Sequence, residues 1–207
     1  QSSNDTFPTA MHLAALGALD SMLLPEMELL AEAIEAKAQG WMDVAKIGRT
    51  HLQDAVPLSV GQEWSAWAEA LRASIVDLGV AREGMMEIAL GGTAVGTGLN
   101  APEGFSEDVA KEIGRLTRLP IRTASNKFYA QATLDPTVRL SASLRGVAVA
   151  LVKIANDVRW LASGPRCGIG ELKLPQNEPG SSIMPGKVNP TQSEALREAS
   201  KDLAAAR

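Results

Sequence analysis

The chain has 207 residues, which is enough to bury one large hydrophobic core or two small ones. Lysine and arginine total 20 against 24 aspartates and glutamates, and this net charge of −4 without a basic cluster argues against a nucleic-acid partner. The single cysteine excludes an internal disulfide and favours a reducing compartment, which we expect to be the cytoplasm. No apolar run approaches the roughly 20 residues of a membrane span, so we expect no membrane partner.

Apolar residues at helical spacing predict an all-α protein. In chain order, the predicted helices cover about Pro8 to Lys37, Pro57 to Leu90, Ser106 to Leu116, Pro136 to Ser163, and a last helix that begins near Pro190. Asp5 and Thr6 are candidate caps of the first helix, and Pro25 should kink it or split it in two. We expect no convincing strand, apart from a few residues near Leu172 to Leu174.

The longest apolar stripe lies in the helix predicted from Pro136. Its members follow each other by alternating steps of four and three: Leu140, Leu144, Val147, Leu151, Ile154, Val158 and Leu161. A heptad pattern of this length predicts a long helix that packs lengthwise on others. Helices of about 30 residues are about 45 Å long, too long for a compact monomer of this size. We therefore expect an elongated long-helix bundle that continues into neighbouring subunits.

Residues 180–190 read Gly-Ser-Ser-Ile-Met-Pro-Gly-Lys-Val-Asn-Pro. Two glycines and two prolines around the serine pair predict an irregular loop. Lys187 and Asn189 place an ammonium group and a side-chain amide beside the serine hydroxyls. Such a set can grip a carboxylate and stabilise an anion next to it, so the loop over about 178–190 is the candidate catalytic loop.

Other polar segments are less specific. His51 lies in the segment from Lys46 to Ala55, where a surface histidine is the plainer interpretation, although its polar neighbours favour a functional one. The hydroxyl and amide groups of residues 1–6 are either an ordinary helix cap or donors for a carboxylate. The stretch from Gly91 to Asn100 is glycine-rich without phosphate-loop spacing and predicts a tight loop near a site. No histidine, cysteine and carboxylate cluster has metal-ligand spacing, so we expect no metal.

The segment at 180–190 resembles the hallmark loop of the fumarase/aspartase superfamily. Four further segments resemble class II fumarate hydratases: residues 1–10, 48–55, 89–100 and 153–170. Aspartases typically carry glutamine where His51 stands, which favours the fumarase branch. The resemblance covers nearly the whole chain. It implies a single central helical domain over 1–207, a fragment without the family's N-terminal domain and C-terminal end.

The resemblance also implies roles for individual residues. Ser181 would be the base that takes the proton from C3 of malate, His51 would act with a water on the departing hydroxyl, and Glu194 would orient His51. The residues that would bind the substrate are Ser2, Ser3, Asn4, Thr50, Ser182, Lys187 and Asn189. The implied reaction is the reversible hydration of fumarate to L-malate in the tricarboxylic acid cycle, without metal or organic cofactor. The implied assembly is a homotetramer whose active sites combine several subunits.

Two alternatives remain open. One is an aspartate ammonia-lyase-like enzyme, which an assay with malate against aspartate would distinguish. The other is an inactive helical oligomerisation fragment. Leu134 also departs from the family pattern, because relatives often carry a histidine there. Since the family's upstream donors are missing and the last helix is cut, we expect this chain by itself to be inactive or very weak.

Overall fold

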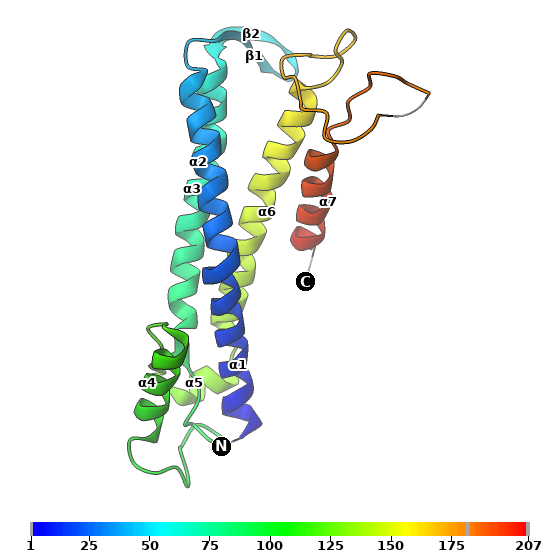
Figure 1. The fold of residues 1–207 in the computed structure, drawn as a ribbon. Helices are drawn as coiled ribbons and strands as arrows, with labels where there is room; N and C mark the ends of the chain where they lie inside the picture. Colours follow the sequence, from blue (N-terminus) through cyan, green and yellow to red (C-terminus); the bar gives the residue numbers. More distant parts are fainter. Residues whose placement is uncertain (1, 181–182, 206–207) are drawn as a thin grey trace. The chain divides into compact units, whose positions relative to one another are not determined.

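The computed structural model describes residues 2–180 and 183–205, most of which are helical, so the all-α class is confirmed (Figure 1). The helices, in chain order, are α1 (Ser3–Ala18), the π-helical segment η1 (Leu19–Leu23), α2 (Leu24–Gly40), α3 (Val60–Met85), α4 (Phe105–Thr117), α5 (Lys127–Ala132), α6 (Asp135–Leu161) and α7 (Thr191–Ala205). The chain divides into two compact units, Gln1–Ser143 and Leu144–Arg207. Helix α6 begins in the first unit and ends in the second.

The first helix begins earlier than the sequence predicts because Ser2 forms a capping box with Asp5. The Ser2 hydroxyl accepts a hydrogen bond from the Asn4 N–H at 3.2 Å, and Asp5 Oδ1 accepts one from the Ser2 N–H at 2.9 Å. The predicted irregularity at Pro25 takes the form of a five-residue π-helical turn, Leu19–Leu23, just before it. The helix runs on from Ser3 to Gly40 over 38 residues.

The segment around His51 is a β-hairpin, so the predictions of a connector there and of no strands are wrong. Strand β1 (Ala45–Thr50) pairs antiparallel with β2 (Gln53–Ser59). Pro57 therefore lies in β2, and α3 begins at Val60, after a capping box between Ser59 and Gln62. Most of β2 is exposed, so no alternation of apolar and polar residues marks it in the sequence.

A second strand pair joins two segments far apart in the chain. Strand β3 (Glu87–Ile88) pairs in parallel with β4 (Arg122–Thr123). The segment near Leu172 to Leu174, the one place where a few strand residues were predicted, has no regular structure.

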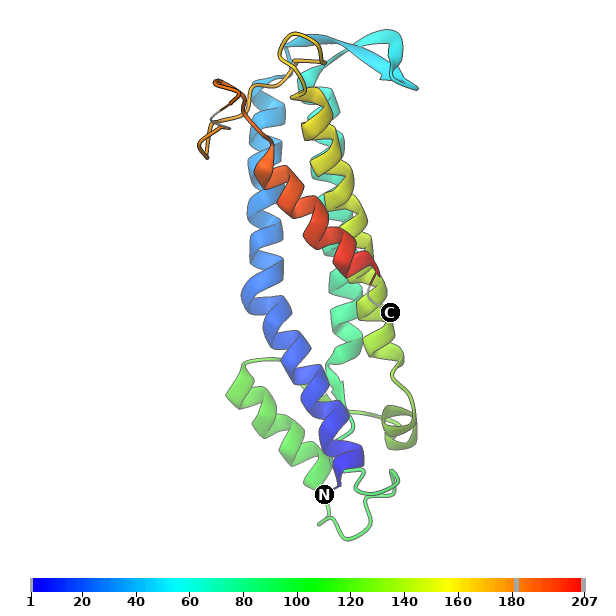
Figure 2. The same ribbon diagram turned by 90° about the vertical axis from the view of Figure 1, so that its right-hand side faces the viewer.

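Helices α2 and α3 form the core of the first unit, where they lie antiparallel and side by side (Figures 1 and 2). Their buried side chains include Met27, Ala31, Ile34, Trp64, Trp67, Leu71 and Leu78. Arg72 donates to both carboxylate oxygens of Glu35, at 2.7 and 2.8 Å, and also binds Glu28. Arg82 makes two bonds to Asp20, at 2.6 and 2.5 Å. The pair is thus joined by apolar burial inside and by ion pairs along its side.

By length and composition alone, the helix from Ser3 to Gly40 would suffice to cross a membrane, with a mean hydropathy of 1.3 over its most apolar 18 residues. Only 17% of those 18 residues are buried within this chain. The helix also carries Asp20, Glu28 and Glu35, which form ion pairs with arginines of α3, and such charges are costly in a lipid-facing helix.

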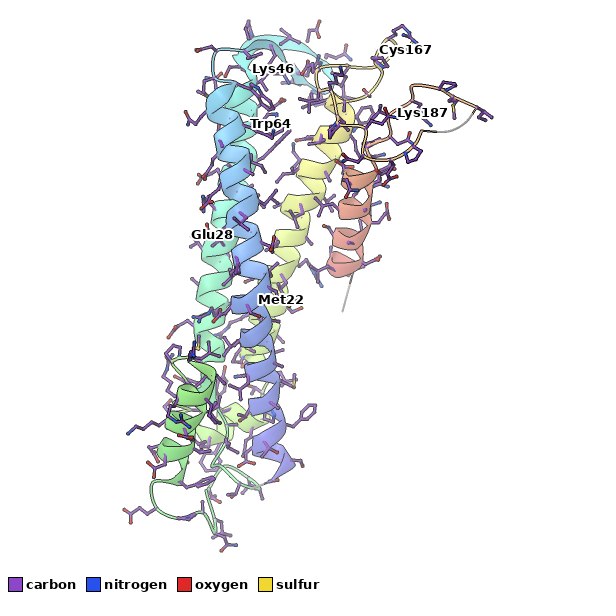
Figure 3. The ribbon with its side chains drawn as sticks, viewed as in Figure 1. Met22, Glu28, Lys46, Trp64, Cys167 and Lys187 are labelled. Carbon is purple, nitrogen blue, oxygen red and sulfur yellow. The ribbon has the colours of Figure 1, made fainter. Side chains whose placement is uncertain are left out.

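The hairpin is anchored at its base. Lys46 Nζ lies 2.6 Å from Glu63 Oε2 on α3, and the lysine side chain is only 6% exposed. Trp64 lies at the centre of an aromatic cluster, 4.8 Å from Trp41 and 4.7 Å from Trp67 between ring centroids. Figure 3 shows Lys46 and Trp64 at the hairpin end of the α2–α3 pair. The base is therefore fixed while the tip remains in solvent.

The second unit contains the end of α6 and all of α7, and the described residues between them, 162–180 and 183–190, belong to no helix or strand. Helix α6 carries the heptad stripe on one uninterrupted helix, as predicted. The chain then turns back on that helix end: the Gly170 N–H donates to the Ser163 carbonyl at 2.8 Å and the Leu172 N–H to the Leu161 carbonyl at 3.0 Å. Helix α7 begins directly after Pro190, close to the predicted start.

Candidate active site

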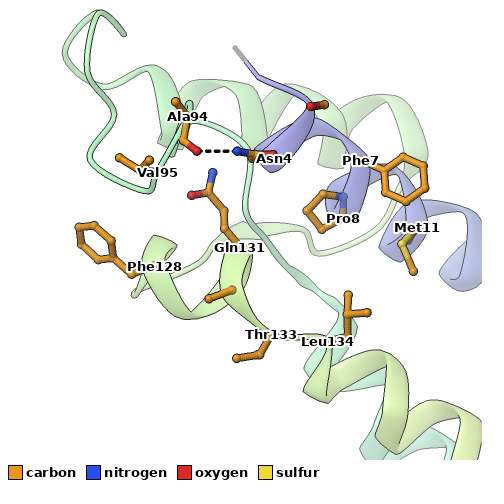
Figure 4. A pocket seen from close by; sticks show the side chains of 12 residues that line it. Asn4, Phe7, Pro8, Met11, Ala94, Val95, Phe128, Gln131, Thr133 and Leu134 are labelled. Carbon is orange, nitrogen blue, oxygen red and sulfur yellow. Dashed lines mark hydrogen bonds between the residues drawn. The ribbon is translucent and has the colours of Figure 1, made fainter.

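A pocket of about 740 Å³ lies beside the N-terminal end of α1 (Figure 4). Ser3 and Asn4 line it from α1, Ala94 and Val95 from the loop after β3, and Phe128 and Gln131 from α5. Two of the predicted substrate-binding residues therefore face a pocket. Its remaining lining is largely apolar and includes Leu134, the position at which we noted a departure from the family pattern.

Asp5 ties the start of α1 to the loop that forms the far wall of this pocket. Its side chain is fully buried, with 0% exposure. Asp5 Oδ2 accepts hydrogen bonds from the backbone N–H groups of Gly91, at 3.1 Å, and Thr93, at 2.9 Å. With the bond from Ser2 N–H to Oδ1, three N–H groups satisfy one buried carboxylate, as a buried charge requires.

Three further side chains bind the same loop. Thr9 Oγ1 accepts from the Leu90 N–H at 3.1 Å. The side-chain amides of Asn4 and Gln131 donate to the carbonyl oxygens of Ala94 and Thr93, each at 2.8 Å. The loop belongs to no helix or strand, so these side-chain hydrogen bonds hold its backbone in place of the regular backbone hydrogen bonds of such an element. We call residues 90–94 and the side chains of Asn4, Asp5, Thr9 and Gln131 the loop clamp.

His51 occupies the tip of the β1–β2 hairpin. Thr50 ends β1 and is paired with Gln53, so His51 and Leu52 form a two-residue turn. Both have positive φ, 55° and 63°, as a type I′ turn requires, although neither is glycine or asparagine. His51 and Thr50 are exposed, and no described residue hydrogen-bonds to the His51 ring. The hairpin therefore presents this imidazole to solvent from a strained backbone position.

The clamp and the hairpin tip lie at opposite ends of the first unit (Figure 1). The continuous helix between them has 38 residues, or about 57 Å at 1.5 Å per residue. Ser2, Ser3 and Asn4 therefore lie together, and Thr50 and His51 lie together, but one copy of this unit does not bring the two groups to one place.

The remaining predicted residues belong to the second unit. Ser181 and Ser182 lie outside the described residues. Lys187 and Asn189 share the wall of a cavity of about 20 Å³, so the structure brings this cation and this amide together. A Cβ on Gly180 would come within 2.8 Å of the Lys187 carbonyl oxygen, which explains the glycine at this point of the loop. Glu194, in the first turn of α7, lies 3.5 Å from Arg159 of α6.

Among residues 2–180 and 183–205, no three histidine, cysteine or carboxylate side chains gather as metal ligands. The sequence predicts only a helix cap at Asp5 and no role for Thr9 or Gln131. The spacing of Ser2 and Asp5 carries the signal of a capping box. The loop residues that bind the other oxygen of Asp5 are 86 and 88 positions away, and no local pattern indicates them.

Known proteins resemble this chain over nearly its whole length. The model of a family described as Lyase matches residues 1–203. The class II fumarate hydratase of Methanosarcina acetivorans is 59% identical over 196 residues, which are 95% of this chain and 40% of that protein. The corresponding protein of Ralstonia nicotianae is 58% identical over 95% of this chain and 42% of its own length.

A solved structure agrees with these relatives. The crystal structure of a recombinant class II fumarase from Schistosoma mansoni matches with a TM-score of 0.94 and 43% identity, covering 99% of this chain and 46% of that one. The chain thus spans less than half the length of the proteins that it matches.

Proposed function

The chain belongs to the Lyase family, and from this premise we propose that it supplies the helical and catalytic-loop segments of a class II fumarate hydratase. The reaction would be the reversible hydration of fumarate to L-malate, as a step of the tricarboxylic acid cycle. The observation that carries the proposal is the identity of 59% over 95% of the chain to a relative with that name. The pocket that Ser3 and Asn4 line supports it.

The proposed chemistry is the formation of a carbanion. Ser181, as its alkoxide, removes the proton from C3 of malate and becomes a neutral hydroxyl, and the negative charge that develops at C3 spreads into the neighbouring carboxylate. Lys187 and Asn189, which share one cavity wall, would stabilise that charge. The hydroxyl leaves C2 as water, after it takes a proton from a water that His51 holds, and the protonated imidazole of His51 replaces that proton. A serine can act as a base only in a closed site from which bulk water is excluded.

The proposed site combines several copies of the chain. Its support is the distance between the clamp and His51, since about 57 Å of helix separates the two groups within one copy. Large apolar side chains of the first unit are also exposed, among them Phe7 at 67%, Val76 at 65% and Val80 at 72%. Exposed apolar surface of this kind is typical of a surface that another molecule covers. We therefore propose a homotetramer with composite active sites.

Activity is tested with the intact protein by the ultraviolet absorbance of fumarate formed from malate. We expect turnover with malate and none with aspartate, and Ser181→Ala should lower turnover by about a hundredfold or more while the fold survives. Turnover of aspartate instead of malate would favour the ammonia-lyase alternative. Near-normal turnover in Ser181→Ala would contradict the assignment of the base.

The assembly is tested separately by light scattering. We expect a tetramer, and Leu151→Asp on the heptad stripe should dissociate it, because the new charge would be buried without a partner. A matched substitution at an exposed polar position of the same helix, Ser141→Asp, should leave the tetramer intact, since Ser141 is not part of the exposed apolar surface. A monomeric native protein at micromolar concentration would contradict the proposal.

We also propose a cytoplasmic location. Cys167, the one cysteine of the chain, is free and exposed, a state that a reducing compartment preserves. Fractionation of cells that express the tagged intact protein would test it, and recovery outside the cytoplasmic fraction would contradict it.

A further inference from the structure

We propose that Asp5 is a positioning residue for substrate binding: by holding residues 91–93 against the start of α1, it fixes the Ala94 carbonyl and the Asn4 amide that bonds to it. This inference rests on the proposed function, since it concerns the binding of that substrate. It adds a residue that touches neither the pocket nor the reacting atoms but determines where a pocket residue points.

The two carboxylate oxygens of Asp5 bind two different segments of the chain. Oδ1 accepts from the N–H of Ser2, at 2.9 Å, and so belongs to the helix cap. Oδ2 accepts from Gly91 and Thr93, at 3.1 and 2.9 Å, and so belongs to the loop. An ordinary capping box needs only the first of these bonds. The second oxygen has a separate task, which is to bind the loop to α1.

The loop does not hold this conformation on local preference. Gly91 has a φ of +97°, and Thr93 has a φ of +57°, which is unusual for a β-branched residue. Residues with such backbone angles persist only when the surrounding contacts hold them there. Asp5 is one source of that constraint, because it binds the N–H on both sides of Gly92 at once.

Ala94, the next residue along this loop, connects the segment that Asp5 holds to the pocket. The Ala94 carbonyl accepts the Asn4 side-chain amide at 2.8 Å, and both residues line the pocket (Figure 4). This bond uses one of the two amide N–H groups of Asn4 and sets the direction of the other N–H and of Oδ1. If the loop moves, the Asn4 amide loses the partner that orients it. Asp5 thereby acts on the substrate through Ala94 and Asn4.

The test compares two aspartates of the same continuous helix. Asp5→Asn replaces an acceptor-only group by an amide, whose NH₂ must face at least one of the three backbone N–H donors. Asp20→Asn is the control, because Asp20 also joins this helix to another element, through its two bonds to Arg82, but does not line the pocket. Both variants are made in the intact protein, and KM and kcat for malate are measured where circular dichroism shows the native fold.

We expect Asp5→Asn to raise KM about tenfold or more, and Asp20→Asn to change KM by less than about twofold. Amide hydrogen exchange of the segment around Gly91 and Thr93 should speed up in Asp5→Asn and not in Asp20→Asn. A native Asp5→Asn protein with unchanged KM would overturn the inference and leave the proposed function standing. A wild-type protein without malate turnover would overturn both.

A second variant covers the case in which Asp5→Asn does not fold. Thr9→Val removes the acceptor of the Leu90 N–H, preserves side-chain shape, and lies outside the pocket lining. It loosens the same loop at one bond instead of two, so we expect KM to rise by about threefold. An unchanged KM in a folded Thr9→Val protein, together with an unfolded Asp5→Asn protein, would overturn the inference, because Asp5 would then serve stability alone.

Discussion

The loop clamp and the hairpin tip both carry proposed active-site residues, and they hold them in opposite ways. Around Asp5 the backbone is buried and cross-linked by side chains, so the Asn4 amide has a fixed place within one copy. At the hairpin tip His51 is exposed and no described residue binds its ring. The first region is preformed, whereas the second would acquire its surroundings from another copy of the chain under the assembly that we propose.

The largest expected effect separates chemistry from folding at the hairpin tip. His51→Asn in the intact protein should lower turnover of malate by about a hundredfold or more, the typical cost of losing a proton-transfer group. The melting temperature should hardly change, since asparagine tolerates the φ of +55° found at this position. Fumarate absorbance and calorimetry measure the two quantities. A fall in both would mean that His51 supports the fold.

A large stability effect is expected at the clamp and not at the hairpin. Asp5→Ala should lower the free energy of unfolding by about 3 kcal/mol or more, because each buried N–H left without an acceptor costs about 1–3 kcal/mol. Asp54→Ala, in the exposed part of β2, should change it by less than about 0.5 kcal/mol. Urea denaturation of this chain measures both. Similar losses in the two variants would erase the distinction between the regions.

A smaller effect of opposite sign is expected at Leu52. Its φ of +63° is costly for a leucine, by about 1–2 kcal/mol, and less so for asparagine. Leu52→Asn should therefore raise the free energy of unfolding by about 0.5–1 kcal/mol, with little loss of burial because Leu52 is 62% exposed. Val56→Asn, in the adjoining strand without positive φ, should give no gain. A gain in both variants would mean that removing an exposed apolar side chain, and not relieving backbone strain, stabilises the hairpin.

The smallest effect concerns the helix pair that separates the two regions. The hydrogen bond from Arg72 lowers the pKa of Glu35 below its ordinary 4.5. A carboxylate with a lowered folded-state pKa contributes stability above that ordinary value, and this contribution is lost as the pH falls through the folded-state pKa. The melting temperature should thus fall less steeply below about pH 4.5 in Glu35→Gln than in the wild type.

The control for this measurement is Glu32→Gln, which removes an exposed carboxylate of the same helix that has no ion pair among the described residues. It should leave the acid dependence unchanged. High salt should weaken the contribution of Glu35, because the pair is partly exposed and its charges are screened. Identical acid profiles for wild type and Glu35→Gln would show that this pair adds nothing measurable.

Much of the helical architecture could be predicted from the sequence. The stripe from Leu140 to Leu161 indicated α6 to within about two residues of its ends, and Pro190 indicated the start of α7. Helices of this kind are stabilised by side chains three and four residues apart, so their pattern can be recognised within a short stretch of sequence. The resemblance of residues 180–190 to a known family was equally a local signal, and the family comparison confirmed it.

Only the tertiary structure decided what surrounds the proposed site. The hairpin at His51 was missed because an exposed two-stranded ribbon buries neither face and so lacks the alternation that indicates strands. The role of Asp5 was missed because its partners at Gly91 and Thr93 lie on a loop remote in the chain. The sequence by itself determined the long helices, though not the short helix α5, and which residues could carry the chemistry. Packing decided which of those residues meet, since contacts between distant segments depend on the whole fold and not on local spacing.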